Sequence, residues 1–332
     1  MRAVVLTGHG GPGALQVQER PSPACGAGQV RIAVAAAGVN FADLMATQGL
    51  YPDAPKTPCV VGYEVAGTVI DRGDGVQALH DGQRVIAATR FGGYAEEVVV
   101  PAGDAFALPD GMSFEQGAAL PVNYGTAYAG LVRYGALREG ERVLIHAAAG
   151  GVGIAATQIA RHHGAEVWGT ASASKHEAIR GFGVEHPIDY RQAGWQRGLP
   201  KFDVVMDAIG GRSFRISYDL LRAGGRLVAF GASSVVSGEK RNLVQAGRAA
   251  LSMPRFNMIK QMSASKAVIG LNLLTLWDEL GTLAPFIAPV QEMLAAGAIA
   301  PVVSDAIPFE RAADAHRILS ERRNVGKVVL VP

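Results

Sequence analysis

The hydrophobic pattern divides the chain into two parts. Up to about residue 122, short apolar and β-branched runs recur between turns rich in glycine and proline. Runs of this length predict short strands, and a series of them at this spacing predicts a partly closed β-barrel. The runs behind this prediction are Ala3–Leu6, Val30–Ala35, Val65–Ile70, Arg84–Ala87 and Glu97–Val100.

A different pattern begins near Ser113, where Ser113 and Gln116 fit a helix-capping box. From Val143 on, short continuous apolar runs alternate with amphipathic segments of helical period. Continuous apolar strands are typical of a parallel sheet buried on both faces, and the alternation predicts a doubly wound α/β sheet. The predicted strands are Val143–His146, Glu166–Thr170, Pro187–Asp189, Phe202–Met206, Gly225–Phe230 and Ala267–Gly270, with a last one at Lys327–Val331. The predicted helices are Gly151–His163, Ser174–Phe182, Ser213–Leu221, Leu283–Ala296 and Phe309–Leu319.

The turn between the first strand and helix of this second part is rich in glycine. Ala148, Gly150 and Gly153 fit the pattern G-x-G-x-x-G with alanine in the first place, and Gly151 and Val152 complete the turn. Glycine lets backbone N–H groups approach a pyrophosphate, and the helix N-terminus beyond offers further unpaired donors. The stretch therefore predicts a dinucleotide site.

The residues after the second strand of the sheet favour NADP(H) over NAD(H). A sheet that binds NAD usually has an acidic residue there, which bonds the ribose diol. This chain has Ser172 and Lys175 instead, a donor and a positive charge suited to a 2′-phosphate. Alternatively, Ser174 caps the next helix and the lysine is solvated. Tyr190 stands where a ring would stack on the adenine.

Composition argues against several other classes of protein. The 332 residues are 49% hydrophobic and 18% charged, with a net charge of +2. This balance argues against nucleic-acid binding, which needs a strongly basic face. Two cysteines, Cys25 and Cys59, make no disulfide framework, so we expect a cytoplasmic, reducing setting. We expect neither a signal peptide nor a membrane span, since no run reaches about 18 apolar residues.

The stretch 240–266 departs from the strand–helix alternation. It carries several cations and no acidic residue, with methionine and phenylalanine interleaved. One interpretation is a surface that lies on an anionic membrane. We favour the other, in which helices of this stretch cap a substrate cleft and hold their cations in water.

Seven motifs resemble a known family over essentially the whole chain. They resemble the zinc-independent quinone oxidoreductase branch of the medium-chain dehydrogenase/reductase superfamily, which includes zeta-crystallin. The GEKRNL motif points more narrowly to the vesicle amine transport protein group. The motifs are GVNFADLMATQGLYP (38–52), GYEVAGTVI (62–70), LPVNYGTAY (120–128), HAAAGGVG (146–153), VMDAIGG (205–211), GEKRNL (238–243) and NVGKVVL (324–330).

The resemblance implies two domains with a cleft between them. Residues 1–122 with 271–332 would form a GroES-like partly closed β-barrel, the catalytic domain. Residues 123–270 would form a Rossmann domain, a doubly wound parallel sheet that binds NADP(H). The nicotinamide would lie near Asn40 and Thr126. Further contacts to the cofactor would come from Phe230, Gly231, Asn324, Gly326 and Lys327.

The resemblance also bears on zinc. Zinc-dependent alcohol dehydrogenases of the superfamily have a cysteine at the position of Asn40 and a histidine at that of Tyr63. Neither residue here is the nitrogen or sulfur ligand that zinc needs, so we expect no metal. Glu64 is then a structural carboxylate.

Without a Lewis acid, hydride transfer to a polarised acceptor is the more plausible chemistry. We predict reduction of a quinone or an α,β-unsaturated carbonyl, with Asn40 and Tyr51 as donors to the substrate oxygen and Asp43 ordering their loop. Alternatively, Asn40 and Asp43 only cap a short helix and Tyr51 only packs.

Two competing functions stay open. One is an enoyl-thioester reductase, and the other is a membrane- or lipid-associated NADPH-binding protein with little catalytic activity. The predicted strand Ala267–Gly270 would leave an unpaired sheet edge, so we expect a homodimer, in keeping with the family's habit.

Overall fold

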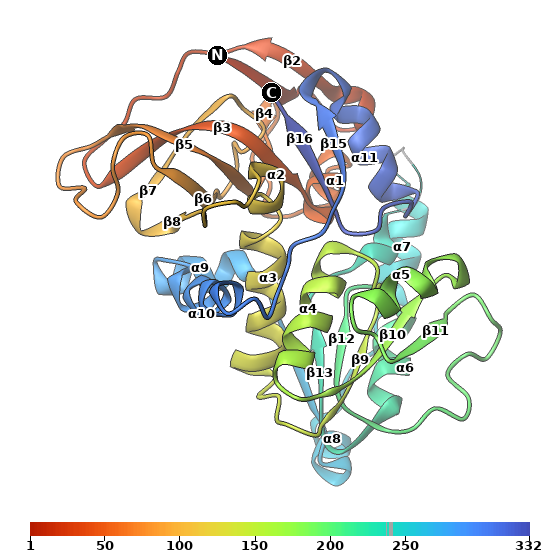
Figure 1. Ribbon diagram of the computed structural model, residues 1–332. Coiled ribbons are helices and arrows are strands. Elements are labelled where there is room, and N and C mark those ends of the chain that lie inside the picture. Colours follow the sequence, from red (N-terminus) through yellow and green to blue (C-terminus); the bar gives the residue numbers. More distant parts are fainter. Residues whose placement is uncertain (237, 239–241) are drawn as a thin grey trace.

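The computed structural model describes residues 1–236, 238 and 242–332. Figure 1 shows two lobes: the N-terminal strands and the last strands form one, and the middle of the chain forms the other. The GEKRNL motif at 238–243 lies partly outside the described residues, as do Lys240 and Arg241 of the basic stretch. No helix in the described ranges has the length and apolar character needed to cross a membrane.

The first lobe is built on a seven-stranded, largely antiparallel sheet. Its main path runs β15-β16-β3-β5-β6-β8, and β7 pairs with β3. The C-terminal strand β16 pairs antiparallel with β3, so the end of the chain returns to the barrel. The strands are β3 (Gln29–Val39), β5 (Glu64–Arg72), β6 (Arg84–Ala88), β7 (Glu97–Pro101), β8 (Ala105–Ala107), β15 (Val303–Pro308) and β16 (Lys327–Val331), and a second sheet holds β1 (Arg2–Leu6), β2 (Leu15–Glu19) and β4 (Cys59–Val60).

The second lobe is a six-stranded parallel sheet in the order β11-β10-β9-β12-β13-β14. This is the order of a Rossmann fold, with its switch point between β9 and β12. The predicted fold class, a GroES-like β-barrel domain with a parallel-sheet Rossmann domain, is confirmed. The strands are β9 (Arg142–Ile145), β10 (Glu166–Ala171), β11 (His186–Asp189), β12 (Phe202–Asp207), β13 (Leu221–Ala229) and β14 (Ala267–Gly270).

Alternate residues of the parallel strands enter two different cores. On β9, Val143 and Ile145 pack in the large core that continues into the barrel lobe, whereas Leu144 packs with Phe202 and Tyr218 in a second core. The sheet is therefore covered on both faces, which is why its strands are continuously apolar. Helix α4 (Gly151–His162) packs on β9 and β10, and α6 (Arg212–Leu220) packs on β12 and β13.

Helices between and around the lobes complete the fold. The predicted capping box is present at the start of α2, where Ser113 and Gln116 bond each other's backbone N–H groups. Helices α9 and α10 pack against α3 beside the junction of the lobes. The helices are α1 (Phe41–Thr47), α2 (Phe114–Gly117), α3 (Pro121–Tyr128), α5 (His176–Gly181), α7 (Leu243–Leu251), α8 (Met258–Ala264), α9 (Leu273–Leu280), α10 (Ala284–Ala295) and α11 (Ala312–Ser320).

In the second part of the chain, three predicted elements begin at the wrong residue by two or more positions. The helices expected from Ser174 and Phe309 begin only at His176 and Ala312, because a 3₁₀ turn comes first in each case. The strand expected from Gly225 begins at Leu221, because Leu221 already pairs with Phe202 of β12 before an irregularity in the register.

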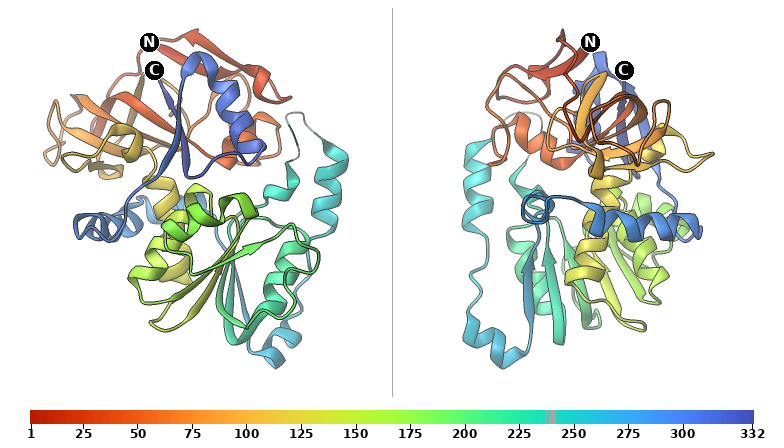
Figure 2. Two further views of the ribbon diagram at one scale, coloured as in Figure 1. Left: turned by 45° about the vertical axis from the view of Figure 1, so that its right-hand side comes forward. Right: turned by 90° about the vertical axis from the view of Figure 1, so that its left-hand side faces the viewer.

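Helix α7 stands beside the junction of the two lobes, whereas α8 lies at the far end of the Rossmann lobe and leads directly into the edge strand β14 (Figure 1 and Figure 2). Their large apolar side chains are exposed: Val244, Leu251, Met258, Ile259 and Met262. None of the described residues in 242–266 lines the cavity between the lobes. The expectation that this stretch caps the cleft is therefore not met by these residues.

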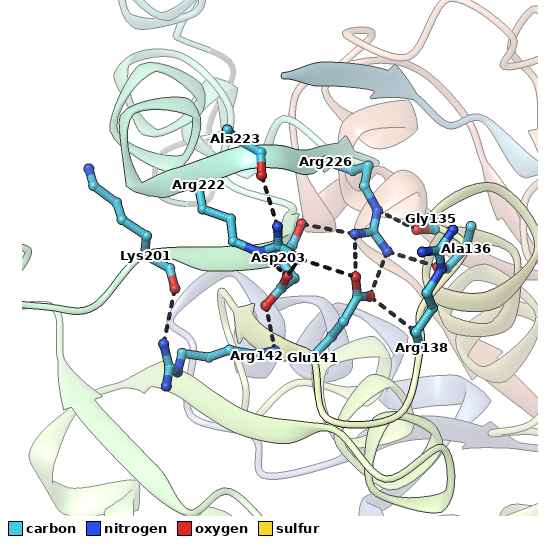
Figure 3. A network of polar contacts seen from close by, with 10 residues as sticks. All are labelled: Gly135, Ala136, Arg138, Glu141, Arg142, Lys201, Asp203, Arg222, Ala223 and Arg226. Carbon is cyan, nitrogen blue, oxygen red and sulfur yellow. Dashed lines mark hydrogen bonds and ion pairs between the residues drawn. The ribbon is translucent and has the colours of Figure 1, made fainter. Parts of the chain in front are cut away.

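A network of charged side chains lies at the amino ends of the Rossmann strands (Figure 3). Arg226 of β13 forms two hydrogen bonds with Glu141, at 2.7 and 2.8 Å. Asp203 of β12 accepts hydrogen bonds from the backbone N–H of Arg142, at 2.9 Å, and from the guanidinium of Arg222. This basal network ties neighbouring strands together at the end of the sheet opposite the glycine turn.

Candidate active site

A cavity of about 1220 Å³ lies between the two lobes, at the carboxyl ends of the Rossmann strands. This is where open α/β sheets bind their ligands. Most of the residues predicted to bind the cofactor line it. Two predicted residues do not: Ala148 is buried beneath the glycine turn, and Asp43 is buried behind the wall. The predicted residues that line the cavity are Asn40, Tyr51, Thr126, Gly150, Gly151, Val152, Gly153, Ser172, Lys175, Tyr190, Phe230, Gly231, Asn324, Gly326 and Lys327.

The glycine turn presents the N-terminus of α4 to the cavity. Gly150 is the residue before the helix, and no side chain caps its first N–H groups. A Cβ on Gly153 would come within 2.3 Å of the carbonyl oxygen of Ala147, so only glycine fits there. The C-terminal loop joins the same turn, because the N–H of Gly326 donates to the carbonyl of Ala149 at 2.9 Å. Free helix donors at a cavity wall make a ready anion site.

One end of the cavity gathers cations after β10 and β11. Lys175 donates to the backbone carbonyls of Arg322 and Asn324, at 2.7 and 2.6 Å. The lysine is therefore neither simply solvated nor free, but joins the Rossmann lobe to the C-terminal loop. Burial, together with the nearby charge of Arg191, lowers the pKa of Lys175. Ser174 does not cap α5, and its hydroxyl lies 3.2 Å from that of Ser172.

Sequence reasoning missed two residues at this end. Arg191 and Arg322 also line the cavity, beside Tyr190 and Lys175. The position of Arg191, directly after Tyr190 and the third strand of the sheet, was a usable signal. Arg322 lies far away in sequence and reaches the site only through the return of the chain, so no local pattern identifies it.

The other end of the cavity contains a buried ion pair. The ammonium of Lys327 forms a salt bridge with Glu64 and donates to the side-chain oxygen of Asn40 at 2.6 Å. Glu64 also accepts from the amide of Asn40 at 3.0 Å and from the N–H of Val122 at 2.7 Å. Lys327 and Glu64 are 3% and 0% exposed, which makes this a nearly dry pair. Glu64 thus has a definite partner, which the sequence did not reveal.

The same network fixes Asn40. Its amide nitrogen is bonded to Glu64 and approaches the carbonyl oxygen of Gly38 at 3.4 Å. Because its oxygen is bonded to Lys327, the amide has one defined orientation. An amide whose two hydrogens already have acceptors is less available to a substrate than sequence reasoning assumed.

Asp43 organises the loop that holds Asn40. Its carboxylate accepts from the N–H groups of Asn40 and Gly62, at 2.8 and 3.0 Å, and from the hydroxyl of Tyr94 at 2.9 Å. Burial raises the pKa of Asp43 to about 7, against the effect of these hydrogen bonds. Behind Tyr94 lies His316, with its Nε2 at 3.4 Å from the hydroxyl, and burial lowers the pKa of His316 to about 3.

Tyr51 and Tyr63 meet at the cavity wall near this network. Their rings are 6.0 Å apart at 82°, an edge-to-face contact. Tyr63 also packs against Phe91, with ring centroids 5.0 Å apart. Burial is the main cause that raises the pKa of Tyr51 to about 12, and the charges of Asp53 and Asp43 add to it.

A third buried polar group lines the cavity at the end of β9. His146 lies between two hydroxyls, with Thr170 Oγ1 3.1 Å from Nδ1 and Ser217 Oγ 3.0 Å from Nε2. Ser217 in turn donates to Asp207 at 2.6 Å. Sequence reasoning found no such network around His146. Its members are the ends of three adjacent strands and one helix face, and only the sheet order brings them together.

No three histidine, cysteine or acidic side chains converge as a metal site within the ranges that the structure describes. At the two positions discussed above, Asn40 is bonded to the ion pair and Tyr63 is packed between aromatic rings. The side-chain groups at this end of the cavity are an amide, hydroxyls and the Glu64 carboxylate, and that carboxylate is already paired with the Lys327 ammonium.

The fold and the comparisons with known proteins define the class of protein. The family model for the alcohol dehydrogenase GroES-like domain matches residues 26–110, and the model described as zinc-binding dehydrogenase matches residues 182–330. The chain belongs to the medium-chain dehydrogenase/reductase superfamily.

Within this superfamily, the chain is similar to several individual proteins. The chain is 42% identical to the human synaptic vesicle membrane protein VAT-1 homolog over 340 residues, which cover 100% of this chain and 86% of the relative. Among solved structures, it is similar to a mycobacterial protein complexed with NADPH, with a TM-score of 0.87, 32% identity and 100% of both chains covered. A quinone oxidoreductase from Pseudomonas syringae has a TM-score of 0.84 and 30% identity, covering 100% of this chain and 99% of that one.

Proposed function

We propose that the protein is an NADPH-dependent, zinc-independent reductase that transfers hydride to a quinone or an α,β-unsaturated carbonyl. One observation supports this most directly. A single cavity joins the open N-terminus of α4, a cationic end with Lys175, Arg191 and Arg322, and a far end with Tyr51 and Lys327. That arrangement suits a long ligand with phosphates in the middle and at one end.

The cofactor in this proposal is NADP(H). Its pyrophosphate takes the backbone N–H groups of Gly150–Gly153, and its 2′-phosphate takes Ser172, Lys175 and Arg191. The solved relative that was complexed with NADPH supports the choice. When bound, the reduced nicotinamide supplies the hydride.

The residues of the chain supply orientation and electrostatics at the far end. Lys327 and Glu64 hold Asn40 and place a fixed ion pair, with no net charge, at this end of the cavity. Tyr51 lines the cavity and donates a hydrogen bond to the substrate oxygen on which negative charge develops, and solvent supplies the proton that completes the reduction. Its high pKa keeps it protonated, and so a donor, at neutral pH. Asn40 contributes mainly by shaping this end of the site.

An acceptor panel tests the proposal. NADPH and NADH oxidation should be compared with 1,4-naphthoquinone, 2-cyclohexen-1-one and an enoyl-CoA thioester. We expect turnover with the quinone or the enone and a clear preference for NADPH. Reduction of the thioester alone would favour the enoyl-thioester reductase. Binding of NADPH without turnover of any acceptor would favour a binding protein with little catalytic activity.

Substitutions at the cavity test which residues take part in hydride transfer and in NADPH binding. Replacing Asn40 and Tyr51 together should reduce turnover by about 100-fold or more, since both positioning and donation are lost. Undiminished turnover would exclude this assignment. Lys175→Ala should weaken NADPH binding about 10-fold while NADH binding changes little, because only NADPH carries the 2′-phosphate.

We also propose a homodimer. Strand β14 is an edge strand of the Rossmann sheet, and Met258, Ile259 and Met262 are exposed on α8 next to it. Pairing two such edges about a two-fold axis would remove the open edge and cover these side chains. Sedimentation equilibrium should then give about twice the chain mass of 34.6 kDa. A monomer that floats with anionic liposomes would instead favour membrane contact.

A further inference from the structure

Tyr63 has a buried hydroxyl with no partner. The side chain is 5% exposed, and its hydroxyl has no hydrogen bond of ordinary geometry with any described residue, although the Tyr51 hydroxyl is near enough to affect its pKa. A buried polar group left unpaired costs free energy, so its persistence in a native structure calls for an explanation. The ring itself is held between Tyr51 and Phe91. The hydroxyl is therefore held in a fixed position and is free to donate a hydrogen bond.

The position of Tyr63 indicates which group its hydroxyl can bond. Both Tyr51 and Tyr63 line the cavity, at the end where Lys327 and Asn40 lie. The Tyr63 hydroxyl is too enclosed to meet a substrate directly, whereas Tyr51 stands beside it and is only half-buried. Tyr51 is therefore the group through which Tyr63 can act.

We propose that Tyr63 is a positioning residue that, once a substrate oxygen is held in the cavity, donates a hydrogen bond to the hydroxyl oxygen of Tyr51, so that the Tyr51 hydroxyl hydrogen points toward that substrate oxygen. A phenol that accepts one hydrogen bond becomes a better donor of another, because linked hydrogen bonds polarise each other. No covalent bond changes in this arrangement. The inference rests on the proposed function of Tyr51 as a donor.

The surroundings of the pair support this direction of donation. Burial is the main cause that raises the pKa of Tyr63 well above its usual range, and the charge of Asp43 adds to it. Tyr63 therefore stays protonated and acts only as a neutral hydroxyl. The pKa of Tyr51 is raised chiefly by burial, and the neighbouring Tyr63 hydroxyl works in the opposite direction, as expected of a donor that favours the phenolate.

A double-mutant cycle tests the inference. Tyr63→Phe should lower kcat for 2-cyclohexen-1-one or 1,4-naphthoquinone by about 10-fold, with KM and NADPH affinity within about 2-fold of wild type. Tyr51→Phe should lower kcat by about 100-fold. The double variant should be no slower than Tyr51→Phe, because Tyr63 has nothing to act on once the Tyr51 hydroxyl is gone. Multiplied effects, or an unchanged Tyr63→Phe enzyme, would overturn the proposal.

Tyr218→Phe is the matched control. The Tyr218 hydroxyl is also buried without a described partner, but Tyr218 packs against Phe256 and does not line the cavity. We expect full turnover from this variant. A loss equal to that of Tyr63→Phe would mean that removal of any buried hydroxyl disturbs the enzyme, and would also overturn the proposal.

A binding probe separates this inference from the proposed function. The push–pull enal 4-dimethylaminocinnamaldehyde absorbs at longer wavelength when its carbonyl oxygen accepts a hydrogen bond. With NADP⁺ present, we expect a red-shifted band in wild type and Tyr218→Phe, a smaller shift in Tyr63→Phe and none in Tyr51→Phe. If wild type turns over no acceptor, the proposed function fails, yet this order of shifts would still support the tyrosine pair. An equal shift in wild type and Tyr63→Phe would refute it.

Discussion

Two charged networks lie at opposite ends of the Rossmann sheet, and they are built differently. The basal network of Glu141, Asp203 and three arginines is spread over several strands and is partly open to solvent, with Arg222 51% exposed. The cavity network is one ion pair, Lys327–Glu64, enclosed with Asn40. Glu141 and Asp203 are only 11% and 10% exposed, so the basal charges are partly desolvated. Each of them is shared among several partners, whereas the Lys327–Glu64 pair loses nearly all of its water and carries the larger desolvation cost.

This difference indicates two roles. The basal arginines also donate to backbone carbonyls, as when Arg226 bonds those of Gly135 and Ala136 at 2.7 and 2.8 Å. That arrangement fastens strands and loops. The cavity pair links the barrel strand β16 to β5 and fixes the orientation of the Asn40 amide. Two hydrophobic side chains at this buried site would stabilise the fold at a lower desolvation cost. We therefore expect the cavity network to serve function and the basal network to serve stability.

Breaking the cavity pair should have the largest effect. Lys327→Met leaves the Glu64 charge buried without its cation, which should lower the free energy of unfolding by about 3–5 kcal/mol. Urea unfolding followed by circular dichroism measures the loss, and turnover should fall by about 100-fold as Asn40 loses its orientation. Adding Glu64→Gln should restore much of the stability without restoring turnover. Recovery of both would contradict a functional role for the pair.

Breaking the basal network should have a smaller effect and a different readout. Arg226→Met removes the bidentate bond to Glu141 and two bonds to carbonyls, which should cost about 1–3 kcal/mol of unfolding free energy, since the group is only partly enclosed. Turnover at 25 °C should stay unchanged. Arg215→Met, which breaks an exposed pair with Asp219 on α6, is the control and should change stability by less than about 0.5 kcal/mol. Reduced turnover in Arg226→Met would show that the two networks are coupled.

The contrast also shows what sequence could and could not predict. The parallel sheet, the barrel and the glycine turn could be predicted from local patterns, because the burial of a strand and the type of a turn depend on residues close together in the sequence. Asn40 and Tyr51 could be proposed because a motif marks them, and Lys175 could be proposed because it follows the second strand of the sheet, where an acidic residue is missing. The ion pair between Lys327 and Glu64 was not, because its members are 263 positions apart and meet only when β16 returns to the barrel.

The same limit applies to smaller features. Lys175 was expected to meet solvent or phosphate, yet it bonds the carbonyls of a loop that lies nearly 150 residues further along the chain. Tyr63 was noticed only as a residue that is not a zinc ligand, since nothing in its sequence context reveals an unpaired hydroxyl. Side-chain partners across lobes need the tertiary structure.

In the wild-type protein, the smallest expected effect on stability is that of pH on the buried groups behind the cavity network. Asp43 has a pKa raised to about 7, so the folded state holds its proton more tightly than the unfolded state, and its contribution to stability falls as pH rises from about 4 to 7. His316 has a pKa lowered to about 3, so its contribution rises with pH between about 3 and 6.5. The two slopes oppose each other, and wild-type stability should vary little from pH 4.5 to 6.5.

Removing the His316 imidazole should reveal the pH dependence of stability that Asp43 causes. In His316→Leu, the free energy of unfolding should fall as pH rises through this window, by up to about 1.4 kcal/mol per pH unit relative to wild type. Urea titrations at pH 4.5, 5.5 and 6.5 measure the slope. The basal network provides the contrast. Burial works to raise the pKa of Glu141, but the hydrogen bonds from Arg226 and the N–H of Arg138 lower it overall, so its stabilising contribution is lost only as pH falls below about 4. A flat profile in His316→Leu would mean that Asp43 stays ionised in the folded protein, held so by Tyr94 and the two N–H donors.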